Sequence, residues 1–175
     1  CGLFAFISGS PFVLIGIFGE AEQNFGYYFA GPVVGYIIGT QSAAWLIRSH
    51  TIGDILGIGG AIVALSGVLE VALAVWGYDT PVAVVAPVAV FMIGVGLILP
   101  QAIAGALAPF PDAAGTAASL FGFIQMAMGA AVGAAVGGFH DGTQMPMVIA
   151  ICLSGGASLA AYFLIARPAF QRTTD

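Results

Sequence analysis

Six apolar stretches divide the chain, and short polar connections separate them. They cover approximately residues 3–18, 27–47, 55–76, 82–106, 116–139 and 147–166. A helix needs about 20 residues to cross a bilayer, so five stretches are long enough and the first is not. Short connections place successive helices antiparallel. The pattern therefore predicts an all-α membrane protein with one six-helix bundle over residues 1–166 and a tail over 167–175.

Local signals mark where several helices begin. Asp54 is predicted as the N-cap of the third helix, because a side-chain carboxylate can accept from the free amides of the first turn. The run Asp79-Thr80-Pro81 supplies a cap and a first-turn proline for the fourth helix. Pro109 and Pro111 interrupt the chain before the fifth helix. These signals support the helix limits drawn from hydropathy.

Composition excludes most soluble classes of protein. Only 6% of the 175 residues are charged and 60% are hydrophobic, whereas a soluble domain carries about 25% charged residues. A net charge of −5 with no lysine argues against a nucleic-acid partner. Two cysteines form no disulfide framework and no metal-binding spacing. His50 and His140 fall in connections at opposite membrane faces, so we expect no shared metal site and no enzymatic activity.

The three arginines predict the orientation of the bundle. With six spans, Arg48, Arg167 and Arg172 all fall on one side of the membrane. The other side receives only acidic side chains, at Glu20, Glu22, Asp79 and Asp141. Basic residues are retained in the cytoplasm, so both chain ends are predicted to be cytoplasmic.

Two helices carry glycines at four-residue spacing, which places small residues on one helix face. The stripes comprise Gly31, Gly35 and Gly39 in the second helix and Gly129, Gly133 and Gly137 in the fifth. Each stripe could pack inside the six-helix unit or contact a partner bundle. The first and fourth helices each contain a proline, Pro11 and Pro100. Each triplet of helices therefore has a proline in its first helix and a glycine stripe in its second, which is a weak internal repeat. Because each repeat has three helices, the two repeats would cross the membrane in opposite senses, as the inverted repeats of transporters do.

Several short motifs resemble one transporter family, in order along most of the chain. They are SGSPFV at 8–13, LILPQ at 97–101, APFP at 108–111, AGTAAS at 114–119, FHDGT at 139–143 and MPM at 145–147. Together they resemble the second half of Bcr/CflA-type drug:proton antiporters of the major facilitator superfamily. The resemblance implies a twelve-helix transporter of which this chain holds the C-terminal six helices. It also implies that both glycine stripes face the missing N-terminal half.

Glu70 is the ionisable residue that lies well inside a predicted span. A carboxylate in a membrane is costly, so such a residue is protonated, paired or close to the interface. Glu70 could carry a coupling proton, or it could be a carboxylate at the rim that reaches outward. The resemblance favours the rim, because the third helix of each triplet lies away from the cavity.

The resemblance places the first and fourth helices on a substrate cavity. The first candidates for substrate contact are therefore Ser10, Phe12, Phe91, Met92 and Gln101, followed by Tyr36 and Gln125. Aromatic and methionine side chains form adaptable apolar surfaces, and glutamines add hydrogen-bonding groups.

The function expected from these features is export of small amphipathic, drug-like compounds in exchange for protons. This export would take place by alternating access between two six-helix halves in the bacterial cytoplasmic (inner) membrane. The proton gradient would be the energy source, and no cofactor is expected. The chain alone is not expected to transport, because it encodes one wall of the cavity. The alternative is a non-transporting six-helix membrane protein, either a degenerate half-gene or a scaffold that pairs with itself.

Overall fold

The computed structural model describes residues 1–139 and 141–167, and over these residues the chain is helical without a strand. His140, Arg172 and the tail from residue 168 lie outside the described residues. The segments are α1 (Gly2–Pro11), η1 (Phe12–Ile17, a π-helix), η2 (Glu22–Asn24), α2 (Phe25–Leu46), α3 (Ile52–Val75), α4 (Pro81–Leu107), η3 (Pro111–Ala113), α5 (Ala114–Gly138), α6 (Met145–Ala161) and η4 (Tyr162–Ala166, a π-helix). The predicted all-α class and the six helices are confirmed.

Four helical segments are long and apolar enough to cross a membrane, one fewer than predicted. They span Ile52–Val75, Pro81–Leu107, Pro111–Gly138 and Met145–Ala166. The apolar segment Gly2–Ile17 is too short. At 22 residues α2 has the length, but its glycines, tyrosines and polar Thr40, Gln41 and Ser42 lower its hydropathy.

The helix α3 begins with a capping box, which corrects the prediction for Asp54. Thr51 is the N-cap, and its hydroxyl oxygen accepts a hydrogen bond from the Asp54 amide at 3.2 Å. The Asp54 carboxylate in turn accepts from the Thr51 amide at 3.1 Å. Asp54 therefore lies three residues inside the cap, the arrangement that satisfies two free amides at once. The predicted cap of α4 is confirmed, since Thr80 accepts from the Ala83 amide at 3.3 Å.

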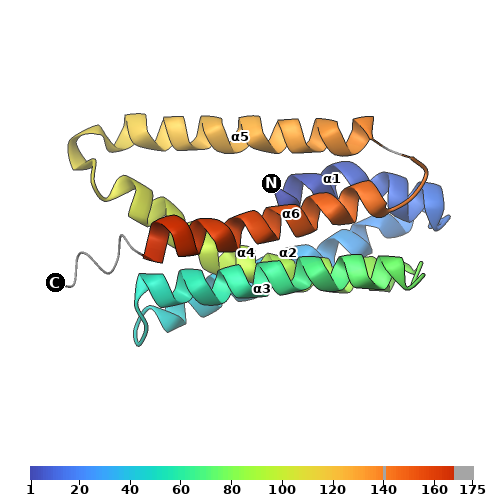
Figure 1. The fold of residues 1–175 in the computed structure, drawn as a ribbon, viewed down its shortest axis with the longest axis horizontal. Coiled ribbons are helices and arrows are strands. Elements are labelled where there is room, and N and C mark those ends of the chain that lie inside the picture. Colours follow the sequence, from blue (N-terminus) through green and yellow to red (C-terminus); the bar gives the residue numbers. More distant parts are fainter. Residues whose placement is uncertain (140, 168–175) are drawn as a thin grey trace.

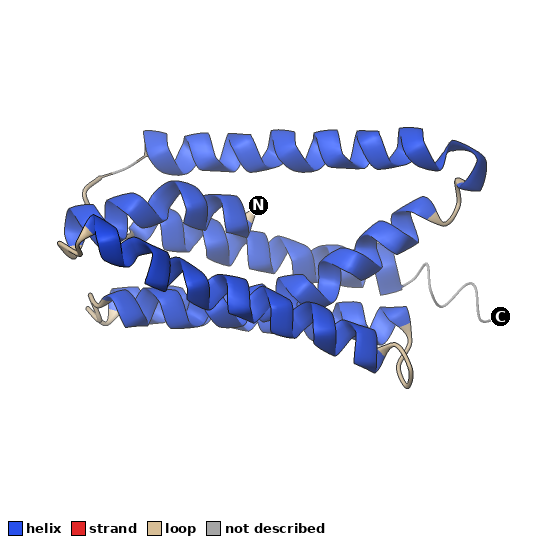
Figure 2. Ribbon diagram, turned by 180° about the vertical axis from the view of Figure 1, so that it is seen from behind, coloured by secondary structure: helices blue, strands red, loops and turns tan. Residues whose placement is uncertain are grey.

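The helices run back and forth along one long axis (Figures 1 and 2). Contacts join α2 to α4, α3 to both α4 and α6, and α1 to both α5 and α6. The main core forms where α1, α4 and α6 meet, and it includes Phe6, Val88, Phe91, Val148 and Ile151. Helix α5 lies along one edge of the bundle, where it contacts chiefly α1, and most of its surface is exposed.

The described arginines and a group of four acidic side chains lie at opposite ends of the bundle. One end, here called the acidic end, is where α3 leads into α4 and α5 leads into α6, and it carries Glu20, Glu22, Asp79 and Asp141. At the acidic end Gln144 donates a hydrogen bond to the Asp79 carboxylate at 2.7 Å, which ties the two connections together. Of the described arginines, Arg48 and Arg167 both lie at the opposite end.

The glycine stripe of α2 packs against α4 of the same chain. A methyl group at Gly35 would collide with the main-chain carbonyl of Ala89, and one at Gly39 with that of Ile93. At Gly31 the added carbon would lie 3.2 Å from the Val85 side chain. The prediction that this stripe faces a missing half is therefore wrong. Spacing places the glycines on one face, but the helix that covers this face belongs to the chain itself.

The stripe of α5 packs against α1 over two of its three glycines. A methyl group at Gly129 would press on the Phe4 ring at 2.5 Å, and one at Gly133 would lie 3.1 Å from the Ser8 hydroxyl. Ser8 also donates a hydrogen bond to the Gly133 carbonyl at 3.2 Å. The prediction of an external interface is therefore wrong for Gly129 and Gly133. Gly137 has open space around it, so for this residue the external interface stays a prediction.

We expect Gly35→Ala and Gly137→Ala to change stability in opposite directions. The methyl group at Gly35 meets main chain that cannot rotate away, so overpacking should cost about 1–3 kcal/mol. At Gly137 nothing obstructs the methyl group, and alanine should favour the helix by up to about 1 kcal/mol. Thermal unfolding of the purified chain in detergent measures both changes. Equal effects of the two substitutions would show that α2 does not lie on α4 in this way.

Candidate functional site

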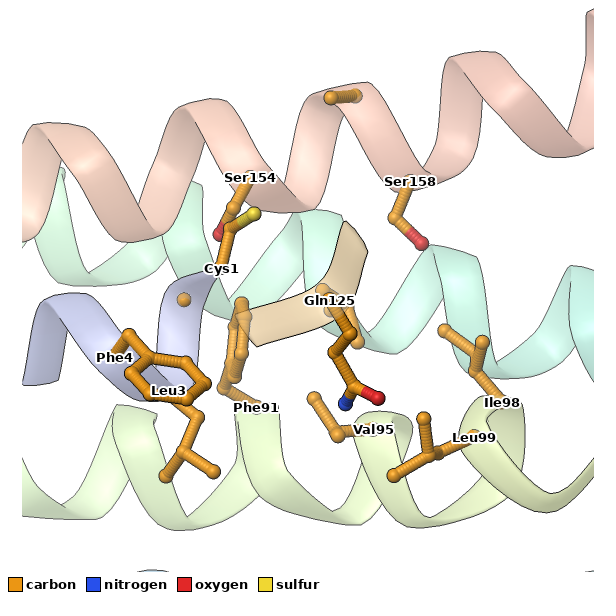
Figure 3. A pocket seen from close by; sticks show the side chains of 13 residues that line it. Cys1, Leu3, Phe4, Phe91, Val95, Ile98, Leu99, Gln125, Ser154 and Ser158 are labelled. Carbon is orange, nitrogen blue, oxygen red and sulfur yellow. The ribbon is translucent and has the colours of Figure 1, made fainter. Parts of the chain in front are cut away.

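A cleft of about 380 Å³ opens between the first turn of α1 and helices α3 to α6 (Figure 3). Its walls are largely apolar, with the rings of Phe4 and Phe91 among them. The lining residues are Cys1, Gly2, Leu3, Phe4, Val63, Phe91, Val95, Ile98, Leu99, Gln125, Ser154, Ala157 and Ser158. The cleft lies beside Gly2, Leu3 and Phe4 of α1.

Glycine at position 2 lets the first turn of α1 form one wall of the cleft. A methyl group there would collide with the Phe91 ring and would lie 2.7 Å from the Ser154 hydroxyl. The start of α1 therefore lies directly on α4 and α6. The Ser154 hydroxyl donates to the Ile151 carbonyl of its own helix at 2.8 Å, so its proton is already used.

Three polar side chains interrupt the apolar wall. Gln125 reaches in from α5, and its amide lies near Val95 and Leu99 of α4 (Figure 3). Ser154 and Ser158 enter from α6, four residues apart on one face of that helix. Pockets for small molecules commonly span about 300–1,000 Å³ and combine apolar walls with a few polar groups. The cleft therefore suits a small amphipathic molecule, held by ring contacts and oriented by an amide and hydroxyls.

The structure brings only two of the predicted substrate contacts, Phe91 and Gln125, into this cleft. Ser10, Met92 and Gln101 are buried inside the bundle, with 0%, 4% and 7% of their surfaces exposed, and do not line the cleft, whereas Phe91, 3% exposed, belongs both to the main core and to the cleft wall. Phe12 lies in η1, half-exposed and closer to the acidic end. Tyr36 is half-buried on α2 and packs against the main core.

Sequence reasoning missed the two serines of α6. Ser154 and Ser158 are spaced by four residues in an otherwise apolar segment, and this spacing could have identified them. The first-turn residues Leu3 and Phe4 carried no such signal, because they belong to a continuous apolar run. Their role in the wall depends on how α1 packs against α4 and α6.

Glu70 lies inside the bundle, away from the cleft. Its side chain is 1% exposed, and neither carboxylate oxygen has a hydrogen-bond partner. The alternative of a rim carboxylate that reaches outward is therefore wrong. Over the described residues, no group of three or more His, Cys, Asp or Glu side chains is arranged to hold a metal ion.

Comparison with curated proteins finds one match whose name states a function. The chain is 33% identical over 165 residues to a bicyclomycin resistance protein homolog of Haemophilus influenzae. The aligned region includes 94% of this chain and 41% of that protein, so the chain spans less than half the length of its relative. The resemblance to Bcr/CflA-type proteins is thereby confirmed. No protein-family model matches the chain, and no solved structure does.

We expect a cysteine placed in the cleft to be far more reactive than one in the core. In a chain whose Cys1 and Cys152 are replaced by serine, Ser158→Cys should react several-fold faster with a small thiol reagent than Ser66→Cys. Both serines lie on apolar helices, but Ser158 lines the cleft whereas Ser66 is 3% exposed, and a thiol must be accessible to react. Rates measured by mass spectrometry under native conditions test this. Similar rates at both positions would mean that the cleft is closed in solution.

Proposed function

We propose that this multi-pass membrane protein is the C-terminal half of a drug efflux transporter of the major facilitator type. It exports small amphipathic compounds in exchange for protons by alternating access, with the proton gradient as its energy source and without a cofactor. The observation that carries this proposal is the similarity to the bicyclomycin resistance protein homolog over 94% of the chain. Protons, a drug-like substrate, the lipid bilayer and an N-terminal six-helix half are the partners of this activity, which is transport rather than enzymatic catalysis.

The pattern of helix contacts supports an inverted repeat of α1–α3 and α4–α6. Exchanging the two triplets turns the α2–α4 contact into an α5–α1 contact and the α3–α4 contact into an α6–α1 contact. Both of these are present, and the α3–α6 contact is unchanged by the exchange. The main helix contacts thus map onto one another, as expected for two repeats related by a two-fold axis, whereas the smaller α4–α5 and α5–α6 contacts have no counterpart of similar size. With an odd number of helices in each repeat, the two triplets cross the membrane in opposite senses.

The cleft supplies one wall of the proposed substrate site. Phe91 and Gln125 are its predicted contacts, and Phe4 and Ser158 join them. Helix α5, which carries Gln125, is mostly exposed along its length. An N-terminal half placed against α5 would complete the enclosure and cover the open surface around Gly137. The other candidates, Ser10, Phe12, Tyr36, Met92 and Gln101, would act on the substrate only if the bundle rearranged to expose them or if the second half reached them.

Transfer of the chain into its relative tests the function directly. We expect the Haemophilus influenzae protein, with its matched region replaced by this chain, to protect an efflux-deficient bacterium against bicyclomycin. The chain expressed alone should give no protection, because it forms one wall of the site. In the chimera, Phe91→Ala should lower resistance several-fold at an equal amount of folded protein in the membrane, because it removes an aromatic wall of the cleft; the amount of folded protein is measured as well, since Phe91 also belongs to the main core.

The matched control in the chimera is Phe163→Ala, which should leave resistance unchanged. Phe163 lies in η4, where it contacts Tyr162 and Arg167, and it lines no part of the cleft. A folded chimera that gives no resistance would favour the alternative of a non-transporting six-helix membrane protein. Proton-linked export by the chain alone would contradict the half-transporter proposal, unless a homodimer rebuilt the second wall.

The separation of charge between the two ends predicts the orientation in the bacterial inner membrane. The end with Arg48 and Arg167 is proposed to be cytoplasmic, as are both chain ends, and the acidic end periplasmic. In a chain without its native cysteines, Thr143→Cys should be labelled by an impermeant thiol reagent on intact cells. Thr173→Cys, outside the described residues, should be labelled only after the cells are opened. Labelling of both positions from the same side would reject an even number of spans.

A further inference from the structure

A single carboxyl group is enclosed in the core where α3, α4 and α6 meet. Glu70 of α3 is 1% exposed. One turn earlier, a methyl group at Gly67 would lie 2.7 Å from the Cα atom of Cys152, so this part of α3 lies directly on α6. Since α3 and α6 run antiparallel, the next turn brings Glu70 to the level of Val148, which has no exposed surface.

The neighbouring helix α4 closes the other side of Glu70. The main chains of α3 and α4 approach each other at Gly59 and Gly94, where an added methyl group on Gly94 would lie 2.8 Å from the Gly59 carbonyl oxygen. Counted along two antiparallel helices from this crossing, Glu70 lies level with Ala83 and Val84, and Val84 is 2% exposed. At this level the buried side chains of α4 and α6, Val84 and Val148, are apolar.

No charged group on the packed helices can compensate an ionised Glu70. Helix α4 has no ionisable residue from Pro81 to Leu107, and α1 has none from Gly2 to Pro11. The ionisable side chains of α6 and η4 are Cys152 and Tyr162. Cys152 faces Gly67, and the Tyr162 hydroxyl packs near Gly57, more than three turns away along α3.

Hydrogen bonding does not compensate Glu70 either. Both of its carboxylate oxygens lack a partner, and in the described part of the chain the one other fully enclosed side-chain atom without a partner is the Ser10 hydroxyl. Burying an unpaired ionised carboxylate in a protein interior costs several kcal/mol even after the surroundings relax. A protonated carboxyl group carries no charge and avoids this cost.

We propose that Glu70 is a proton-binding site, occupied by a proton and sealed from water in this arrangement of the helices. The carboxyl group binds one proton as a neutral acid, and the proton can leave only when α3, α4 and α6 separate far enough for water to enter. Binding and release are therefore tied to a rearrangement of the bundle. The site lies outside the cleft, and its occupancy does not depend on the proposed transport function.

The small number of glutamates allows a direct test on the unmodified chain. The sequence contains three, Glu20, Glu22 and Glu70, so labelling glutamate with carbon-13 at the side-chain carboxyl gives three NMR signals. At neutral pH exposed carboxylates are ionised. We expect two signals at the position of an ionised carboxylate, which shift on acidification, and one at the position of a neutral acid, which does not move between mildly acidic and mildly alkaline pH.

Two substitutions assign the signals. Glu70→Gln should remove the signal that does not titrate, and the control Glu22→Gln should remove one that does. If Glu70→Gln does not fold, Glu20→Gln and Glu22→Gln identify the Glu70 signal as the one that both retain. A Glu70 signal at the ionised position at neutral pH would overturn the proposal. Because the measurement does not involve a drug, a failure here is distinct from a failure of the proposed function.

Discussion

Close approach of helix main chains through glycine is the constraint on which this bundle depends. Lipid tails are as apolar as leucine, so burial of apolar surface does not drive helices together inside a membrane. Contact area and short separations must supply the stability instead. Gly35 and Gly39 bring α2 onto the carbonyls of α4, Gly59 and Gly94 join α3 to α4, and Gly155 brings α6 to the Val63 carbonyl of α3. Helices α2, α3, α4 and α6 are thereby fixed to one another.

Helix α5 is the exception, and the cleft exists because of it. Its close contacts are made with α1, through Gly129 and Gly133, and most of its other side chains are exposed. The space between α5 and the close-packed helices is therefore incompletely filled, and Gln125 projects into it. A polar amide on the least enclosed helix is well placed to meet a ligand. The glycines fix α2, α3, α4 and α6 tightly to one another. The cleft therefore forms beside α5 and the first turn of α1.

Helix positions could be predicted from the sequence because their causes are local, whereas the neighbours of each helix could not. The ends of the apolar runs and the positions of the prolines predicted the first and last residues of every helix to within a few residues. The spacing of Gly35 and Gly39 correctly placed them on one face, but no local signal says which helix covers that face. The same limit applies to the site. Ser10 and Gln101 belong to the predicted helices, yet helix rotation turns them into the core while leaving Gln125 in the cleft.

The distribution of glycine along α3 also explains why a proton could be sealed at Glu70 and still be released. Glycines at 57, 59, 60 and 67 hold α3 against α4 and α6, and beyond Gly67 no further glycine contact follows before the helix ends. Glu70 therefore lies just past this zone of close main-chain contact, at the level of the buried apolar residues Val84 and Val148. Side chains can repack at lower cost than main chains can separate, so rearrangement of α3 is easier around Glu70 than around Gly67, while the hydrogen bond from Gln144 to Asp79 keeps the connections at the acidic end joined. The contacts that stiffen the bundle thus also define the boundary at which its enclosed acid can reach water.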